Sequence, residues 1–153
     1  FALSEQSANA FGLAGSARNL VRPGARPVSS MTPTIVVRDG RARVLVGSPG
    51  GTRILTSVML VLLRRFVFEA DLPDSVVGPR FHHQLWPDQV FVERGGFPAA
   101  VLASLRARGH TVIETPSWCN VQAIEIDAAG LMTAVSDPRG EGAAGVLEPQ
   151  GHP

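Results

Sequence analysis

The feature that most limits which folds this chain can adopt is a predicted β-hairpin followed by a glycine-rich turn and a long apolar segment. Asp39-Gly40 is the strongest kind of short-range hairpin signal, and β-branched residues flank it on both sides. We therefore predict strands near 34–38 and 42–47. After the glycine turn, apolar residues recur at the 3.6-residue spacing of a helix, at Ile54, Leu55, Val58, Met59, Leu62 and Phe66. We predict a helix from about 50 to 67, and because it is apolar on nearly every side we expect a sheet to bury it.

The rest of the chain predicts short strands interspersed with helices. Segment 71–79 contains two prolines and is expected to be a loop or at most a short helix. Pro98 opens and Gly109 closes a predicted helix over 98–108. Further strands are predicted near 80–84, 90–93, 111–114, 121–126 and 131–135. This order predicts an antiparallel sheet with helices layered on it, in the α+β class.

Composition bounds the size and the partners of the protein. At 153 residues with a hydrophobic fraction of 44%, the chain is one domain or part of one. The net charge is +1 and the arginines are scattered, so no nucleic-acid partner is expected. The longest apolar stretch, 54–63, is much shorter than the roughly 20 residues that a membrane span needs. Cys119 is the single cysteine, which excludes an internal disulfide.

The chain begins with Phe1, without an initiator methionine or a signal segment. We expect it to be an internal or processed piece of a longer protein.

Two small polar sites could bind an anion. Ser29 and Ser30 are adjacent hydroxyls, restrained by Pro27 and Pro33, and they can donate to one carboxylate without adding charge. In Gly47-Ser48-Pro49-Gly50-Gly51, the backbone N–H groups precede a helix, which suits an oxyanion in acyl transfer. The plainer interpretations are a pair of turn serines and a strand-to-helix turn. The residues by themselves favour those plainer interpretations.

Other polar residues carry less specific patterns. His82 and His83 alternate faces on a strand, so together they cannot chelate one metal, and we expect no metal site and no cofactor. A Ser/His/Asp triad can be drawn from Ser48, His110 and Asp137, but no spacing prefers it. Cys119 is interpreted as a small buried hydrophobic residue. Segment 136–139 is a turn in which Asp137 can contact Arg139.

The chain resembles the C-terminal part of the small subunit of gamma-glutamyltransferases, also called gamma-glutamyl transpeptidases. The resemblance covers almost the whole chain, and the serine pair together with the double glycine is its most specific part. The similar segments are Asn9-Ala10-Phe11-Gly12-Leu13, Arg26-Pro27-Val28-Ser29-Ser30-Met31-Thr32-Pro33-Thr34-Ile35, Gly47-Ser48-Pro49-Gly50-Gly51-Thr52-Arg53-Ile54, Gly78-Pro79-Arg80-Phe81-His82-His83-Gln84, Pro87-Asp88, Val121-Gln122-Ala123-Ile124 and Ser136-Asp137-Pro138-Arg139-Gly140.

The resemblance implies an N-terminal nucleophile hydrolase fold, a four-layer αββα sandwich of which this chain is the small-subunit portion. It divides the chain into an irregular connector (1–28), the small-subunit sheet and helix layers (29–140) and a C-terminal tail (141–153). Ser29 and Ser30 would bind the carboxylate of the gamma-glutamyl group. The backbone N–H groups of Gly50 and Gly51 would form the oxyanion hole.

The resemblance also implies partners and processing. Family members are precursors that cut themselves into a large and a small subunit, whose new N-terminal Thr attacks the gamma-glutamyl amide of glutathione. The acyl group then passes to water, an amino acid or a peptide. That Thr lies upstream of this segment, so we expect the 153-residue chain alone to be inactive. Family members are periplasmic or extracellular.

Two alternatives remain open at this point. One is a related acylase of the same superfamily that cleaves glutaryl or cephalosporin amides. The other is a non-catalytic homologue that acts as a binding module because its parent lacks the nucleophile.

Overall fold

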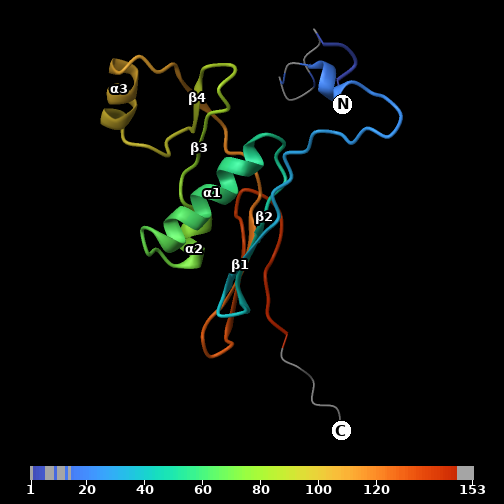
Figure 1. The fold of residues 1–153 in the computed structure, drawn as a ribbon. Coiled ribbons are helices and arrows are strands. Elements are labelled where there is room, and N and C mark those ends of the chain that lie inside the picture. The colour runs from blue at the N-terminus through green and yellow to red at the C-terminus, as the bar shows by residue number, and fades with distance from the viewer. Residues whose placement is uncertain (1, 6–8, 10–12, 14, 148–153) are drawn as a thin grey trace.

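The computed structural model describes residues 2–5, 9, 13 and 15–147. Along the chain the elements are η1 (Ala17–Asn19), β1 (Thr34–Arg38), β2 (Arg41–Gly47), α1 (Arg53–Phe66), α2 (Leu72–Val77), β3 (Phe81–His82), β4 (Val90–Glu93), α3 (Ala99–Ala107), β5 (Val112–Thr115), β6 (Gln122–Ile126) and β7 (Met132–Ser136). They form an α+β structure in which helices pack on sheets (Figure 1). The class predicted from the sequence is therefore confirmed.

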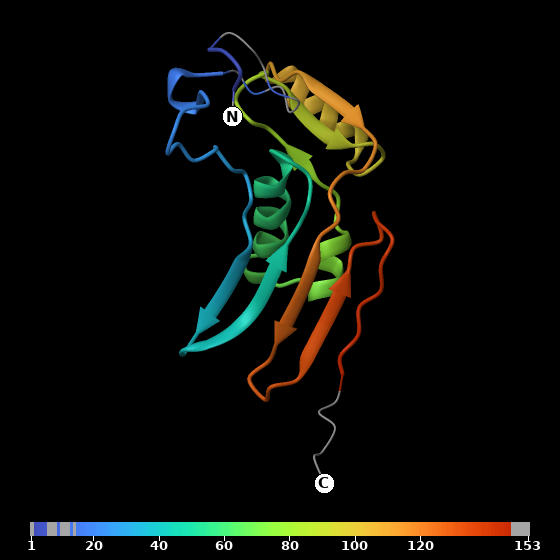
Figure 2. The same cartoon turned by 90° about the vertical axis from the view of Figure 1, so that its right-hand side faces the viewer.

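A four-stranded antiparallel sheet, in the order β1-β2-β6-β7, forms the larger part of the fold. The Asp39-Gly40 turn has positive φ at both residues, 53° and 72°, as the predicted hairpin requires. Val44 and Val46 alternate with more exposed neighbours along β2 and lie in the core. Helices α1 and α2 cover this face of the sheet (Figure 2), and their buried residues, such as Val58 and Leu72, complete the core.

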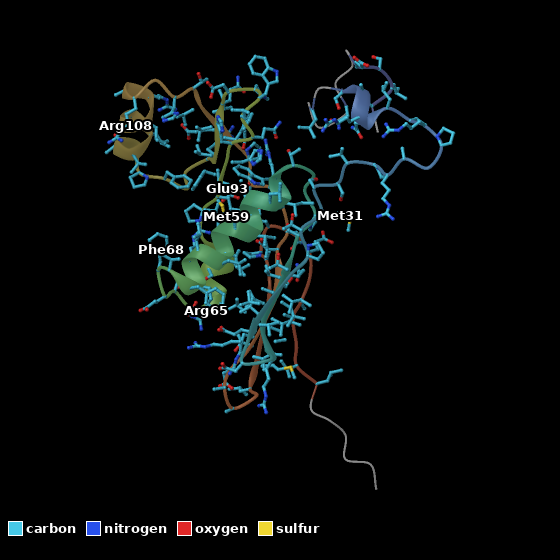
Figure 3. The ribbon with its side chains drawn as sticks, in the orientation of Figure 1. Met31, Met59, Arg65, Phe68, Glu93 and Arg108 are labelled. Carbon is cyan, nitrogen blue, oxygen red and sulfur yellow. The ribbon has the colours of Figure 1, made fainter. Side chains whose placement is uncertain are left out.

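Helix α1 is less buried than its composition predicts. Its buried residues are Ile54, Ser57, Val58, Leu60 and Val61. Apolar side chains on its remaining surface are exposed, including Leu55 (52%) and Met59 (42%). Figure 3 shows Met59 partway along α1 and Phe68, which is also exposed, just beyond the end of the helix. A sheet buries the helix as expected, but among the described residues it covers one face only.

The second sheet corrects the expectation of a purely antiparallel arrangement. It has three strands in the order β3-β4-β5, and it lies beyond the N-terminal end of α1 (Figures 1 and 2). Strand β3 is shorter than predicted and pairs with β4 antiparallel. Strands β4 and β5 are parallel, with α3 forming the crossover between them. A crossover helix allows the parallel arrangement.

Segment 71–79 forms a helix rather than a loop. Helix α2 begins after Asp71, whose carboxylate accepts a hydrogen bond from the backbone N–H of Asp74 at 2.7 Å. Pro73 lies in the first turn, where a missing N–H costs nothing. Leu72 and Val76 are almost fully buried, so packing stabilises this short helix. In the described part of the chain, no helix combines the length and apolarity needed to cross a membrane.

Candidate active-site cleft

The turn between β2 and α1 requires its two glycines. Gly50 has a φ of +140° and Gly51 a φ of +60°, conformations that side chains strongly disfavour. The carbonyl oxygens of Gly50 and Gly51 accept from the N–H groups of Arg53 and Ile54, at 3.2 Å each. Within the described residues, neither glycine N–H donates a hydrogen bond. The turn therefore has two N–H donors free, directly before the N-terminus of a helix.

The serine loop is bonded to this turn. The Ser30 hydroxyl donates to the carbonyl oxygen of Gly51 at 2.9 Å. The Ser29 hydroxyl oxygen accepts from the N–H of Met31 at 3.1 Å, so its own hydrogen remains available. A hydroxyl has one hydrogen, so Ser30 can donate to a bound anion only after rotating away from Gly51.

Both serines line a cleft of about 740 Å³. Thr52 and Thr56 line it from the start of α1, and His82 and Gln84 line it from β3 and the residues after it. The segment before the serines contributes Asn9 and Asn19. The lining therefore combines hydroxyl, amide and imidazole groups, which suit a small polar ligand.

His82 lies in a chain of hydrogen bonds along this cleft. Its side chain is almost fully buried, with Nδ1 2.9 Å from Thr56 Oγ1 and Nε2 2.9 Å from Gln84 Oε1. Gln84 Nε2 donates to the carbonyl oxygen of Trp86, so Gln84 Oε1 faces the imidazole as an acceptor. This assignment places a hydrogen on Nε2 of His82. Burial lowers the pKa of His82; the hydrogen bond with Gln84 opposes this shift, and nearby Arg53 and His83 add to it.

A buried ion-pair network lies behind the cleft. Arg80 and Asp137 are both fully buried and form an ion pair at 2.5 Å. Arg139 contacts the Asp137 carboxylate at 3.1 Å, as the turn sequence predicts, and binds both oxygens of Glu93. Burial by itself would raise the pKa of Asp137, but hydrogen bonds from the Val121 N–H and from Arg80 hold the pKa below its ordinary value.

The residues of the possible Ser/His/Asp triad do not lie together, and Cys119 is less buried than expected. Asp137 serves the ion-pair network, and the Ser48 hydroxyl donates to the carbonyl oxygen of Pro49. His110 is exposed beyond α3, so the structure does not support the triad with Ser48 and Asp137. Cys119 is half-buried rather than buried, and its backbone has a φ of +63°.

The histidine pair behaves as its alternation predicts. His82 is buried and His83 is exposed, with its Nε2 3.0 Å from Asp88. Among the described residues, no group of three or more His, Cys, Asp and Glu side chains could hold a metal ion.

Sequence reasoning missed the residues that support the cleft. From the sequence, Arg80 enters only within a similar segment, Glu93 only within a predicted strand and Thr56 only within a predicted helix. A polar residue inside an otherwise apolar helix, such as Thr56, is a signal that could have found one of them. Residues 10–12 of the motif at 9–13 and residues 148–153 of the predicted tail lie outside the described residues.

Comparisons with known proteins show which family the chain is similar to. The Gamma-glutamyltranspeptidase family model matches residues 1–147. The chain is 44% identical to the glutathione hydrolase proenzyme of Pseudomonas aeruginosa over 146 residues, which cover 93% of this chain and 26% of the relative. It is 40% identical to the Escherichia coli glutathione hydrolase proenzyme over 131 residues, 86% of this chain and 22% of the relative. The chain thus spans about a quarter of the length of these curated relatives.

The similarity extends to three dimensions. The gamma-glutamyltranspeptidase of Pseudomonas nitroreducens, solved in complex with L-DON, superposes with a TM-score of 0.87 and 37% identity. The match covers 95% of this chain and 76% of that solved chain.

Proposed function

The chain belongs to the gamma-glutamyltranspeptidase family and has its N-terminal nucleophile hydrolase fold, and on that premise we propose that it forms part of an enzyme that transfers or hydrolyses gamma-glutamyl groups. The donor would be glutathione or a related gamma-glutamyl amide. The acceptor would be water, an amino acid or a peptide.

We assign the serine loop to the donor carboxylate. Ser29 has a hydroxyl hydrogen available, and Ser30 would exchange its bond to Gly51 for one to the carboxylate. The free N–H groups of Gly50 and Gly51 would bind the oxygen of the amide carbonyl as negative charge develops on it. Donors that are already oriented stabilise that charge without reorganisation during the reaction.

One observation carries this proposal. The hydrogen bond between the Ser30 hydroxyl and the Gly51 carbonyl oxygen holds the serine loop against the glycine turn at 2.9 Å. The serines that line the cleft, which suit a carboxylate, therefore lie next to the glycine turn, whose N–H groups suit an oxyanion. A short acyl group with a carboxylate near its other end, such as gamma-glutamyl, would contact both the serines and the turn.

The same proposal includes a nucleophile and a partner. The attacking group would be the N-terminal Thr of a small subunit, released when a precursor cuts itself, and the large subunit of that precursor would complete the enzyme. Two curated relatives are named proenzymes, which supports processing of this kind. A periplasmic or extracellular location is proposed on the same family grounds.

Replacing Ser29 and Ser30 together by Ala tests the carboxylate assignment. Each lost hydrogen bond to a charged group is worth about 1.5–3 kcal/mol, so the KM for a gamma-glutamyl anilide should rise at least about tenfold. The assay uses the complete expressed protein, and kcat should change less than KM. Ser104→Ala, in an exposed position of α3, is the matched control and should leave both constants unchanged. An unchanged KM in the double variant contradicts the assignment.

A further inference from the structure

The segment 118–121 contacts the glycine turn at Gly50 and the first residue of α1 at Arg53. The Cys119 sulfur packs against Gly50 so closely that a methyl group added to Gly50 would overlap it. The Trp118 ring lies against the guanidinium of Arg53, 4.6 Å from the ring centroid to the guanidinium carbon. Arg53 is the first residue of α1, and its N–H donates to the Gly50 carbonyl oxygen.

Arg53 contacts a second aromatic ring. Its guanidinium carbon is also 5.1 Å from the centroid of the Phe91 ring, so two rings attract the cation. Each such contact is worth about 0.5–2 kcal/mol, so the pair restrains the Arg53 side chain. The start of α1, and with it the end of the glycine turn, is therefore fixed to the Trp118 side chain.

The segment itself is anchored to the buried ion pair. The Trp118 carbonyl oxygen accepts from Arg80 Nη1 at 3.0 Å, and the Val121 N–H donates to Asp137 at 2.9 Å. Trp118 is 9% exposed. Two hydrogen bonds to a fully buried pair of charges hold the ends of the segment, so it can act as a rigid support.

We propose that residues 118–121 position the glycine turn for its proposed role, with Trp118 acting through Arg53 and Cys119 acting directly on Gly50. This inference rests on the proposed function of the Gly50 and Gly51 N–H groups. It adds two positioning residues that touch neither the carboxylate nor the reacting carbonyl. An oxyanion site loses efficiency when its donors are displaced, so the support should act on kcat more than on KM.

Trp118→Ala and Trp118→Phe in the complete expressed protein test the support. Losing an oxyanion donor outright costs about 10²–10³ in rate. Trp118→Ala should lower kcat for a gamma-glutamyl anilide by a smaller factor, about tenfold or more, with KM changed less. The indole N–H has no partner among the described residues, so Trp118→Phe keeps the ring face without losing a hydrogen bond, and kcat should recover. Phe68→Ala, an exposed aromatic residue, is the matched control.

Hydrogen exchange of the backbone N–H groups of Arg53 and Ile54, which are hydrogen-bonded to the glycine turn, provides a measurement that needs no activity. Exchange should become faster in Trp118→Ala, stay near wild type in Trp118→Phe and be unaffected in Phe68→Ala. If the protein turns over no gamma-glutamyl donor but exchange responds in this way, the proposed function fails and the support stands. Unchanged exchange together with unchanged kcat in Trp118→Ala overturns the inference.

Alkylation tests the contact between Cys119 and Gly50. Iodoacetamide transfers a carbamoylmethyl group to the thiolate as iodide leaves, and the added bulk should push the glycine turn and lower kcat. Cys119→Gly removes the thiol and suits the φ of +63°, so this variant should be insensitive to the reagent. Full kcat after complete alkylation of Cys119 contradicts the contribution of Cys119.

Discussion

His82 is a buried residue that also lines the cleft. It is 2% exposed, lines the cleft, and takes part in hydrogen bonds at both ring nitrogens. Burial is the largest cause of its lowered pKa, and the positive charge of Arg53 contributes in the same direction. The lowered pKa therefore favours the neutral imidazole in the folded structure.

This lowered pKa predicts a pH-dependent stability. Below pH 6.5, the ordinary pKa of histidine, the unfolded chain binds a proton at this residue more readily than the folded protein does. Stability should therefore fall as the pH decreases through 6.5 and level off below the folded-state pKa. Thermal unfolding between pH 8 and pH 5 measures this slope.

His82→Gln should flatten that slope, and His83→Gln, which changes an exposed histidine, should preserve it. Equal slopes in the wild type and in His82→Gln would show that another group causes the pH dependence.

Helix α1 has one buried face and one exposed face, and both faces are apolar. Leu60 is 6% exposed and Leu55 is 52% exposed, although both belong to the same apolar helix. Packing of one face against the sheet and α2 stabilises the helix. The opposite face contributes little to stability in the described structure.

Leu60→Ala and Leu55→Ala form a matched pair that tests this difference. Removing a buried leucine side chain costs about 2–5 kcal/mol, because transfer free energy is lost and a cavity remains. The exposed position should change the free energy of unfolding by about 0.5 kcal/mol or less. Urea unfolding of the two variants measures both values. Similar losses at the two positions would mean that Leu55 is covered as well as Leu60.

At the scale of the whole molecule, an ion-pair network connects the two sheets. Arg80 precedes β3 of the three-stranded sheet, and Asp137 follows β7 of the four-stranded sheet. Arg139 extends the network to Glu93 of β4 and to the carbonyl oxygens at the end of α2. The network therefore fixes how the two sheets lie relative to each other (Figure 2).

Breaking this network should lower the free energy of unfolding more than breaking an ion pair on the surface does. Asp137→Ala leaves Arg80 buried without a counterion, which typically costs about 3–5 kcal/mol. Arg106→Ala removes an exposed pair with Glu114 at 3.6 Å, worth about 1 kcal/mol or less, and is the control. Urea unfolding should separate the two clearly, and similar losses would argue against the network as the connection between the sheets.

The hairpin and the main helix could be predicted because their causes are local. Asp39-Gly40 adopts the positive φ values that its turn requires, and the apolar spacing of α1 follows the helical period. Helix α2 was harder to predict because its stability depends on burying Leu72 and Val76 against elements distant in sequence. The parallel pairing of β4 with β5 was missed for a similar reason, since antiparallel and parallel strands have similar local patterns.

The sequence by itself determined the class of the fold, the hairpin, the glycine turn and the family to which the chain belongs, because turn chemistry, periodicity and motif order are properties of neighbouring residues. Only the tertiary structure decided that Arg80 pairs with Asp137, that His82 contacts Thr56, and that Cys119 packs against Gly50. These contacts join residues far apart in the chain, and their partners are selected by burial and by the need to satisfy buried polar groups, which no local pattern records.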